Sequence, residues 1–122
     1  MAARPQPPED ITPHEFFTTW VPRTVDEDPE RRARLGDTAA SLVFVLTQAQ
    51  QTASEFTLHI AEGRVRGEPG RIDEPDLRVE VDLETWRALN RGEMSAPEAL
   101  LRRRLHYQGS LLLALKLQLI LG

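Results

Sequence analysis

The chain has 122 residues, which predicts one compact domain with a single sizeable core. Its net charge of −4 argues against nucleic acid as a partner, because proteins that bind phosphate backbones usually carry a basic surplus. It contains no cysteine, which excludes disulfides, thiolate catalysis and cysteine-based metal sites.

The chain begins with a proline-rich stretch without an apolar run. We therefore expect residues 1–11 to form a flexible lead-in and not a signal peptide, followed by a single domain over residues 12–122. "TPHE" is a capping-box pattern, with Thr12 as N-cap and Glu15 three residues later. We expect this first helix to end at Pro22, since helical backbone is disfavoured before a proline. "DEDPERRARLGD" predicts a short charged helix or a turn that stops at Gly36.

Four stretches then have the composition of strands. "SLVFVL" is β-branched and aromatic, and after the polar connection "QAQQTAS" the segment "EFTLHI" alternates apolar and polar residues. "RVRGEPGR" predicts a short strand that runs into a loop rich in glycine and proline, and "DLRVEV" alternates again. The alternation indicates a mostly antiparallel sheet with one buried face.

Helices return after the strands. Asp82 can cap a helix over residues 83–91 with Gly92 as its stop, and Ser95 opens a second capping box before "PEALLRRR". Residues 105–109 predict a last edge strand, and Gly109 precedes a terminal helix. This order predicts an α+β fold, with about five strands and helices covering one face of the sheet.

The terminal helix is apolar on nearly every side. From Leu111 to Leu121 only Lys116 and Gln118 are polar, and on a helix these two point about 200° apart. Such a helix must be covered on most of its circumference, and a small domain has little protein for this. A partner subunit, a membrane surface or an apolar ligand would supply the cover, as would burial as an ordinary core helix. The apolar run is too short to cross a bilayer, which takes about 20 residues.

The order of these motifs resembles the sterol carrier protein 2-like sterol/lipid-binding domain family. "ALLRRRLHYQGSLLLALKL" resembles the closing part of that domain, where a strand with Leu105 and Tyr107 leads through Gly109 into an apolar helix. "LVFVL" and "EFTLHIAEGRV" resemble its first hairpin, and "EPDLRVEVDLETWRALNRGEMSAPEAL" its middle. The chain departs from the family where an aromatic residue and a glycine usually precede the last strand, because Leu100 and Arg103 stand there.

The resemblance implies a sheet and helices that enclose an apolar tunnel. It implies non-enzymatic binding or transfer of a fatty acid, acyl chain, isoprenoid or sterol-like ligand, without a cofactor. It is most natural for a bacterial, cytoplasmic, stand-alone member. A subunit-packing or accessory module, for example of the quinone-biosynthesis type, is the alternative, and the chain would be a monomer or a homodimer.

Strand alternation and helical faces nominate residues for lining the tunnel, with ordinary core packing as the competing role for each. The candidates are Phe44, Phe56, Leu58, Val79, Val81, Trp86, Leu89, Met94, Leu101, Leu112, Leu115 and Leu119. Met94 lies between two helices, where a flexible side chain would act as a gate or pack as an ordinary loop residue.

The remaining charged and titratable residues give no catalytic pattern. Arg102, Arg103 and Arg104 close a helix, where cations interact well with the negative dipole end, or else they contact an anionic membrane surface or headgroup. His59 and His106 lie on polar sides of strands and would meet on the open face of the sheet, too few for a zinc site. A small hydrolase that uses either histidine is the third hypothesis, and ester turnover would support it.

Overall fold

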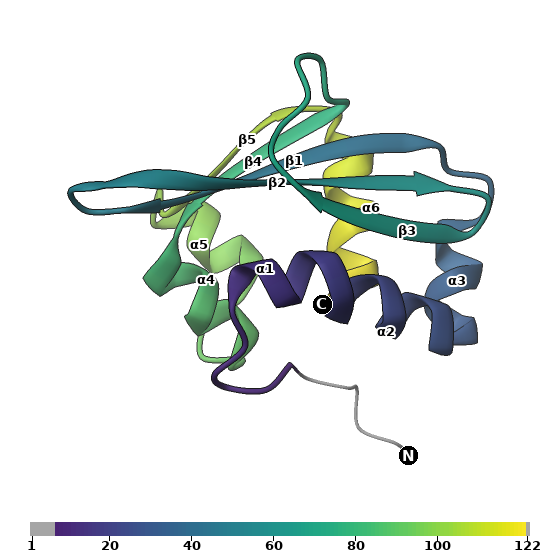
Figure 1. Ribbon diagram of the computed structural model, residues 1–122, viewed down its shortest axis with the longest axis horizontal. Helices are drawn as coiled ribbons and strands as arrows, with labels where there is room; N and C mark the ends of the chain where they lie inside the picture. The colour runs from purple at the N-terminus through teal and green to yellow at the C-terminus, as the bar shows by residue number, and fades with distance from the viewer. Residues whose placement is uncertain (1–6, 122) are drawn as a thin grey trace.

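A five-stranded sheet forms one layer of the molecule, and helices pack against one of its faces (Figure 1). The computed structural model describes residues 7–121, and side chains as far as Gln118. In chain order the elements are α1 (Pro13–Glu15), the π-helical turn η1 (Phe16–Trp20), α2 (Val21–Glu27), α3 (Pro29–Leu35), β1 (Ala40–Gln48), β2 (Gln51–Ala61), β3 (Arg64–Pro69), β4 (Leu77–Asp82), α4 (Leu83–Asn90), α5 (Ala96–Leu101), β5 (Leu105–Gly109) and α6 (Leu111–Leu121).

The strands lie in the order β3-β2-β1-β4-β5. Three neighbouring pairs are antiparallel, and β1 with β4 is parallel, so the predicted α+β class with a mostly antiparallel sheet is confirmed. Phe44 of β1 lies opposite Phe56 of β2 and Val79 of β4. All three are buried in one core with the helices, so this row marks the helix-covered face.

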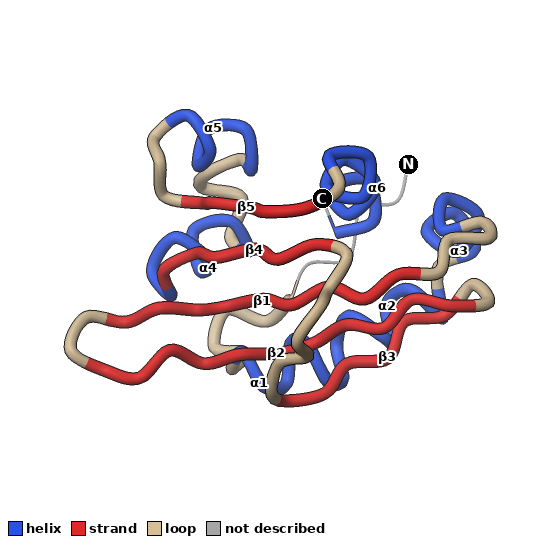
Figure 2. Tube along the Cα trace, turned by 90° about the horizontal axis from the view of Figure 1, so that it is seen from above, coloured by secondary structure: helices blue, strands red, loops and turns tan. Residues whose placement is uncertain are grey.

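Residues 70–76 cross the other face of the sheet to join β3 to β4 (Figure 2). The Thr57 hydroxyl donates to the Gly70 carbonyl at 2.7 Å, and the Asp76 N–H donates to the Ser41 carbonyl at 2.8 Å. Val43, paired with Thr57 in the sheet, is buried as well. The open face is therefore partly covered, because a parallel β1–β4 pair requires the chain to cross over.

The predicted helix caps are present. Thr12, Asp82 and Ser95 each accept a hydrogen bond from the backbone N–H three residues later, as N-caps do. Burial by itself raises the pKa of Asp82. Hydrogen bonds from the Thr85 hydroxyl and N–H outweigh burial, so the pKa of Asp82 lies below its ordinary value. These contacts fix where the helices begin.

The first helix does not end at Pro22, so that prediction was wrong. Phe16–Trp20 forms a π-helical turn, in which the Val21 N–H donates to the Phe16 carbonyl, and α2 continues from there. Pro22 falls in the first turn of α2, where the N–H that proline lacks would have no partner within that helix. The π-helical turn before it is wider than an α-helical turn and has room for the proline ring. The continued helix brings Val25 into the core.

The polar connection after β1 is also shorter than predicted. Only Ala49 and Gln50 form the turn, and β2 begins at Gln51. The polar residues at the start of β2 join the sheet because pairing with β1 satisfies their backbone N–H and C=O groups. Several of their side chains stay exposed to solvent.

Candidate functional site

Large apolar side chains are exposed on each of the last three elements, α5, β5 and α6, and we call this set the leucine surface. Leu101 is 86% exposed and Leu112 is 79% exposed, whereas Leu113 is buried in the core. The surface consists of Leu100 and Leu101 of α5, Tyr107 of β5, and Leu111, Leu112 and Leu115 of α6. The domain thus covers one side of α6 and leaves leucines on the other.

The covered side of α6 is attached to the helical layer. α6 packs against α3, and the Lys116 ammonium donates to the Thr38 hydroxyl. Leu117 packs against the core. In the described part of the chain no helix combines the length and apolar character needed to cross a membrane.

Six of the predicted tunnel residues lie together in the hydrophobic core. The Phe17 ring lies 4.8 Å from the Phe44 ring and 5.1 Å from the Phe56 ring, measured between centroids. The six are Phe44, Phe56, Leu58, Val79, Val81 and Trp86. They are packed against protein side chains here, and their contact with a ligand stays a prediction.

The other six candidates are dispersed. Leu89 and Met94 are half-buried, and the side chain of Leu119 lies outside the described residues. Leu101, Leu112 and Leu115 are exposed on the leucine surface, because α6 turns Leu113 and Leu117 toward the core. The candidates therefore divide between the interior and this surface.

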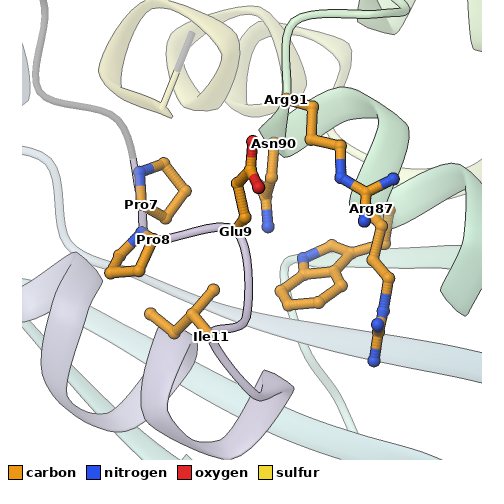
Figure 3. Close-up of a pocket in the computed structure, with 8 residues that line it drawn as sticks. Pro7, Pro8, Glu9, Ile11, Arg87, Asn90 and Arg91 are labelled. Carbon is orange, nitrogen blue, oxygen red and sulfur yellow. The ribbon is translucent and has the colours of Figure 1, made fainter.

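A cleft of about 70 Å³ separates the N-terminal segment from α4 (Figure 3). Pro7, Pro8, Glu9 and Ile11 form one wall, and Arg87, Asn90 and Arg91 line the other. Trp86 also lines it and was the one member of this group among the predicted site residues. The signal that sequence reasoning missed is the four-residue spacing of Arg87 and Arg91, which puts two cations on one helix face.

The two histidines do not meet, so that prediction was wrong. His59 is on β2 and His106 on β5, three strand spacings apart. His59 lies 3.4 Å from the Ser41 hydroxyl and 2.9 Å from a Glu68 carboxylate oxygen. The hydrogen bond from His59 lowers the pKa of Glu68.

In this row of serine, histidine and glutamate, the backbone N–H of Ser41 already has an acceptor. The Ser41 N–H donates to an Asp76 carboxylate oxygen at 2.8 Å. That N–H is therefore not free to donate to a substrate oxyanion. Among the described residues, no three histidine, aspartate or glutamate side chains gather in a way that could hold a metal ion.

The comparison with protein families decides what kind of domain this is. The model of the SCP-2 sterol transfer family matches residues 20–122. The chain belongs to this family. A comparison with curated proteins found no match.

Solved structures of other SCP-2 domains have the same fold. The sterol carrier protein domain 2 of Helicoverpa armigera has a TM-score of 0.71 at 16% identity, over 90% of this chain and 89% of that chain. Palmitated SCP2L2 from Aedes aegypti has a TM-score of 0.70 at 19% identity, over 88% and 93%. The sec-alkylsulfatase Pisa1 from Pseudomonas sp. has a TM-score of 0.65 at 16% identity, over 92% of this chain but 16% of that chain. A fold of this kind therefore also occurs within a much larger enzyme chain.

Arg103 lies in the corner between α5 and β5, where the sequence departs from the expected glycine. α5 ends at Leu101, and Arg103 has φ of 59°, in the left-handed region that glycine adopts without strain. All three arginines are exposed, and Arg102 pairs with Glu98 at 3.3 Å. The corner keeps a backbone that suits glycine, with an arginine in its place.

Replacing Arg103 with glycine should therefore stabilise the protein by about 0.5–1 kcal/mol, because relief of left-handed strain exceeds the added freedom of the unfolded chain. Urea denaturation followed by circular dichroism measures the change. Arg102→Gly is the matched control, because it removes the same charge at a φ of −83° and should not stabilise. Equal effects of the two changes would contradict the strain at Arg103.

Proposed function

We propose that the protein binds and carries one lipid molecule without transforming it. Membership in the SCP-2 family supports lipid binding or transfer in general. The observation that carries the proposal here is the leucine surface, since exposed apolar patches of this kind mark sites for ligands, membranes or partners. The carboxylate of Asp76 beside Ser41 supports the non-enzymatic part of the proposal.

The ligand class that we propose is a single apolar chain, such as a fatty acid, an acyl chain or an isoprenoid, with a sterol-like molecule as a further candidate. The palmitated form of the Aedes aegypti domain supports testing a fatty acyl chain first. A ligand that covers about 300 Å² of apolar surface would gain roughly 7 kcal/mol before the costs of association. Few hydrogen bonds are then needed to hold it.

We propose that the chain lies between α6 and the aromatic core, against the residues nominated from the sequence. The outward leucines of α6 would turn toward the ligand as it enters, which explains why this helix is apolar all round. Arg102, Arg103 and Arg104 are exposed and directly follow the exposed Leu101 in the chain, so they would contact an anionic membrane during delivery, at about 1 kcal/mol for each cation.

Native mass spectrometry of the purified protein, followed by organic extraction, tests the proposal. We expect one bound lipid for each chain, displaced when palmitate is added. An apo mass that takes up neither palmitate, an isoprenoid nor a sterol would contradict it.

A double substitution tests the role of the leucine surface. Leu112→Glu with Leu115→Glu should weaken palmitate binding at least tenfold, because two charges would have to be desolvated against the chain. The free energy of unfolding should change by less than about 1 kcal/mol, since both side chains are more than half exposed. Gln118→Glu is the control, because it adds a charge to an exposed position of the same helix and removes no apolar group.

The sheet edge favours subunit packing as a second candidate. β5 is an edge strand, and Tyr107 is exposed on it between α5 and α6. Edge strands pair readily with another chain. Sedimentation velocity over a range of concentrations distinguishes the two functions. A dimer that loses its affinity in the Leu112→Glu, Leu115→Glu variant and binds no lipid would favour packing.

A further inference from the structure

We propose that the cleft between residues 7–11 and α4 is a binding site for a carboxylate group. Trp86 lines this cleft and is only 5% exposed, and its indole Nε1 has no hydrogen-bond partner among the described residues. Asn90 lines the same cleft, and its side-chain nitrogen is likewise buried without a hydrogen-bond partner in the described part of the chain. Buried donors without acceptors are rare, because each costs the full desolvation of the group.

The unpaired groups specify the chemistry of the missing partner. An indole N–H donates and cannot accept, and an amide nitrogen likewise only donates. The ligand must therefore present acceptor oxygens to both. A carboxylate has two oxygens with about four lone-pair sites, so one group can serve both donors.

Charge favours an anion over a neutral acceptor. Arg87 of α4 and Arg91, the C-cap of that helix, both line the cleft, and Glu9 from the N-terminal segment is the acidic lining side chain opposite them (Figure 3). Two guanidinium groups against one carboxylate leave a net charge of +1 at the cleft. A guanidinium nitrogen of Arg91 lies 4.0 Å from a carboxylate oxygen of Glu93, which is a long distance for an ion pair. The C-terminal end of α4 carries a partial negative charge of about half an elementary charge. The two arginine charges are larger than this helix-dipole charge.

Size and lining favour a small group with an apolar continuation. A cleft of about 70 Å³ accommodates roughly two waters or one carboxylate. Ile11 and Pro8 contribute apolar wall, and behind the donors the Trp86 ring contacts the Phe16 ring at 5.3 Å. The carboxylate of an aliphatic acid suits such a site, with its chain against apolar side chains and its oxygens on the donors.

The carboxylate could belong to a free small acid or to the headgroup of the carried lipid, and the lipid reading rests on the proposed function. Acetate, octanoate and the neutral octanol separate these cases by isothermal titration calorimetry. Affinity that rises from acetate to octanoate, with octanol at least tenfold weaker than octanoate, identifies a lipid headgroup. Equal affinities for acetate and octanoate identify a site for small carboxylates.

The indole N–H of Trp86 reports occupancy directly in ¹⁵N-labelled protein. The chain has two tryptophans, so Trp20→Phe assigns the Trp86 signal. Octanoate should move this signal in the direction of a new hydrogen bond, and octanol should not. A Trp86 signal that responds to neither acid would overturn the proposal.

Charge variants test the recognition without disturbing the core. Arg87→Gln should weaken octanoate about three- to tenfold and leave octanol unchanged. Asn90→Asp, which puts a negative charge where a donor stood, should weaken it further, whereas Glu9→Gln should strengthen it. Arg71→Gln is the control, because it removes an exposed cation from the crossover segment, on the face of the sheet opposite the helices.

The site and the proposed function fail separately. If octanol and octanoate bind equally and these variants change nothing, the carboxylate site is wrong while lipid carriage stands. If native protein holds no lipid and takes up no palmitate, but acetate moves the Trp86 signal, carriage is wrong while the site stands.

Discussion

Replacing Gly67 with alanine should destabilise the protein by about 3 kcal/mol or more, a large part of the stability of a typical domain. Gly67 is in β3, opposite Leu58 of β2. A Cβ atom there would lie 1.8 Å from the carbonyl oxygen of Phe17 and 2.7 Å from its carbonyl carbon. Both are backbone atoms, so the clash is relieved only if η1 moves away from the sheet.

Urea denaturation of both proteins measures this loss. Gly63→Ala is the matched control, because Gly63 has φ of 74° and no atom within 4 Å of the added carbon. It tests left-handed strain alone and should cost about 1–2 kcal/mol. If Gly67→Ala costs no more than Gly63→Ala, η1 does not lie against β3 as closely as the structure has it.

Replacing Phe17 with alanine should cost about 3–5 kcal/mol, through lost burial and the cavity that remains. Phe17 is 1% exposed and contacts rings from β1, from β2 and from η1 itself. Neighbours on rigid elements cannot collapse into the space, so the cavity persists. The same denaturation experiment measures the loss.

Leu112→Ala is the control for Phe17, because Leu112 is 79% exposed and its truncation should change stability by less than about 0.5 kcal/mol. A small cost at Phe17 would mean that the aromatic cluster is not closely packed. In that case the space beneath Phe44 and Phe56 would be open to a ligand even in the free protein.

Several predictions from sequence were confirmed because the signals are local. Thr12, Asp82 and Ser95 each contact a backbone N–H three residues away, so a short window of sequence is enough to place a helix start. Pro22 shows the limit of such rules. Its effect depended on the π-helical turn before it, which no motif in "FFTTWVP" announces.

The candidate site was predicted only in part. Apolar alternation placed Phe56 and Leu58 correctly on the covered face, and Trp86 in the core. The helical pattern of α6 has no polar side, so it could not say that Leu113 faces inward and Leu112 outward. Nothing in the sequence indicated that Arg87 and Asn90 line a cleft together with Trp86. That cleft exists only because the N-terminal segment folds back across α4.

The sequence by itself determined the order of most helices and strands along the chain, three helix caps and the apolar face of the alternating strands, since these depend on backbone hydrogen bonds and side-chain spacing within a few residues. It did not determine where the first helix ends or where β2 begins. The order of the strands, the path of residues 70–76 over the open face, the exposed leucines of α6 and the unpaired donors beside residues 7–11 were decided by tertiary structure. Each of these arises where segments far apart in the chain compete for the same surface, and only the packed fold decides which surface is covered.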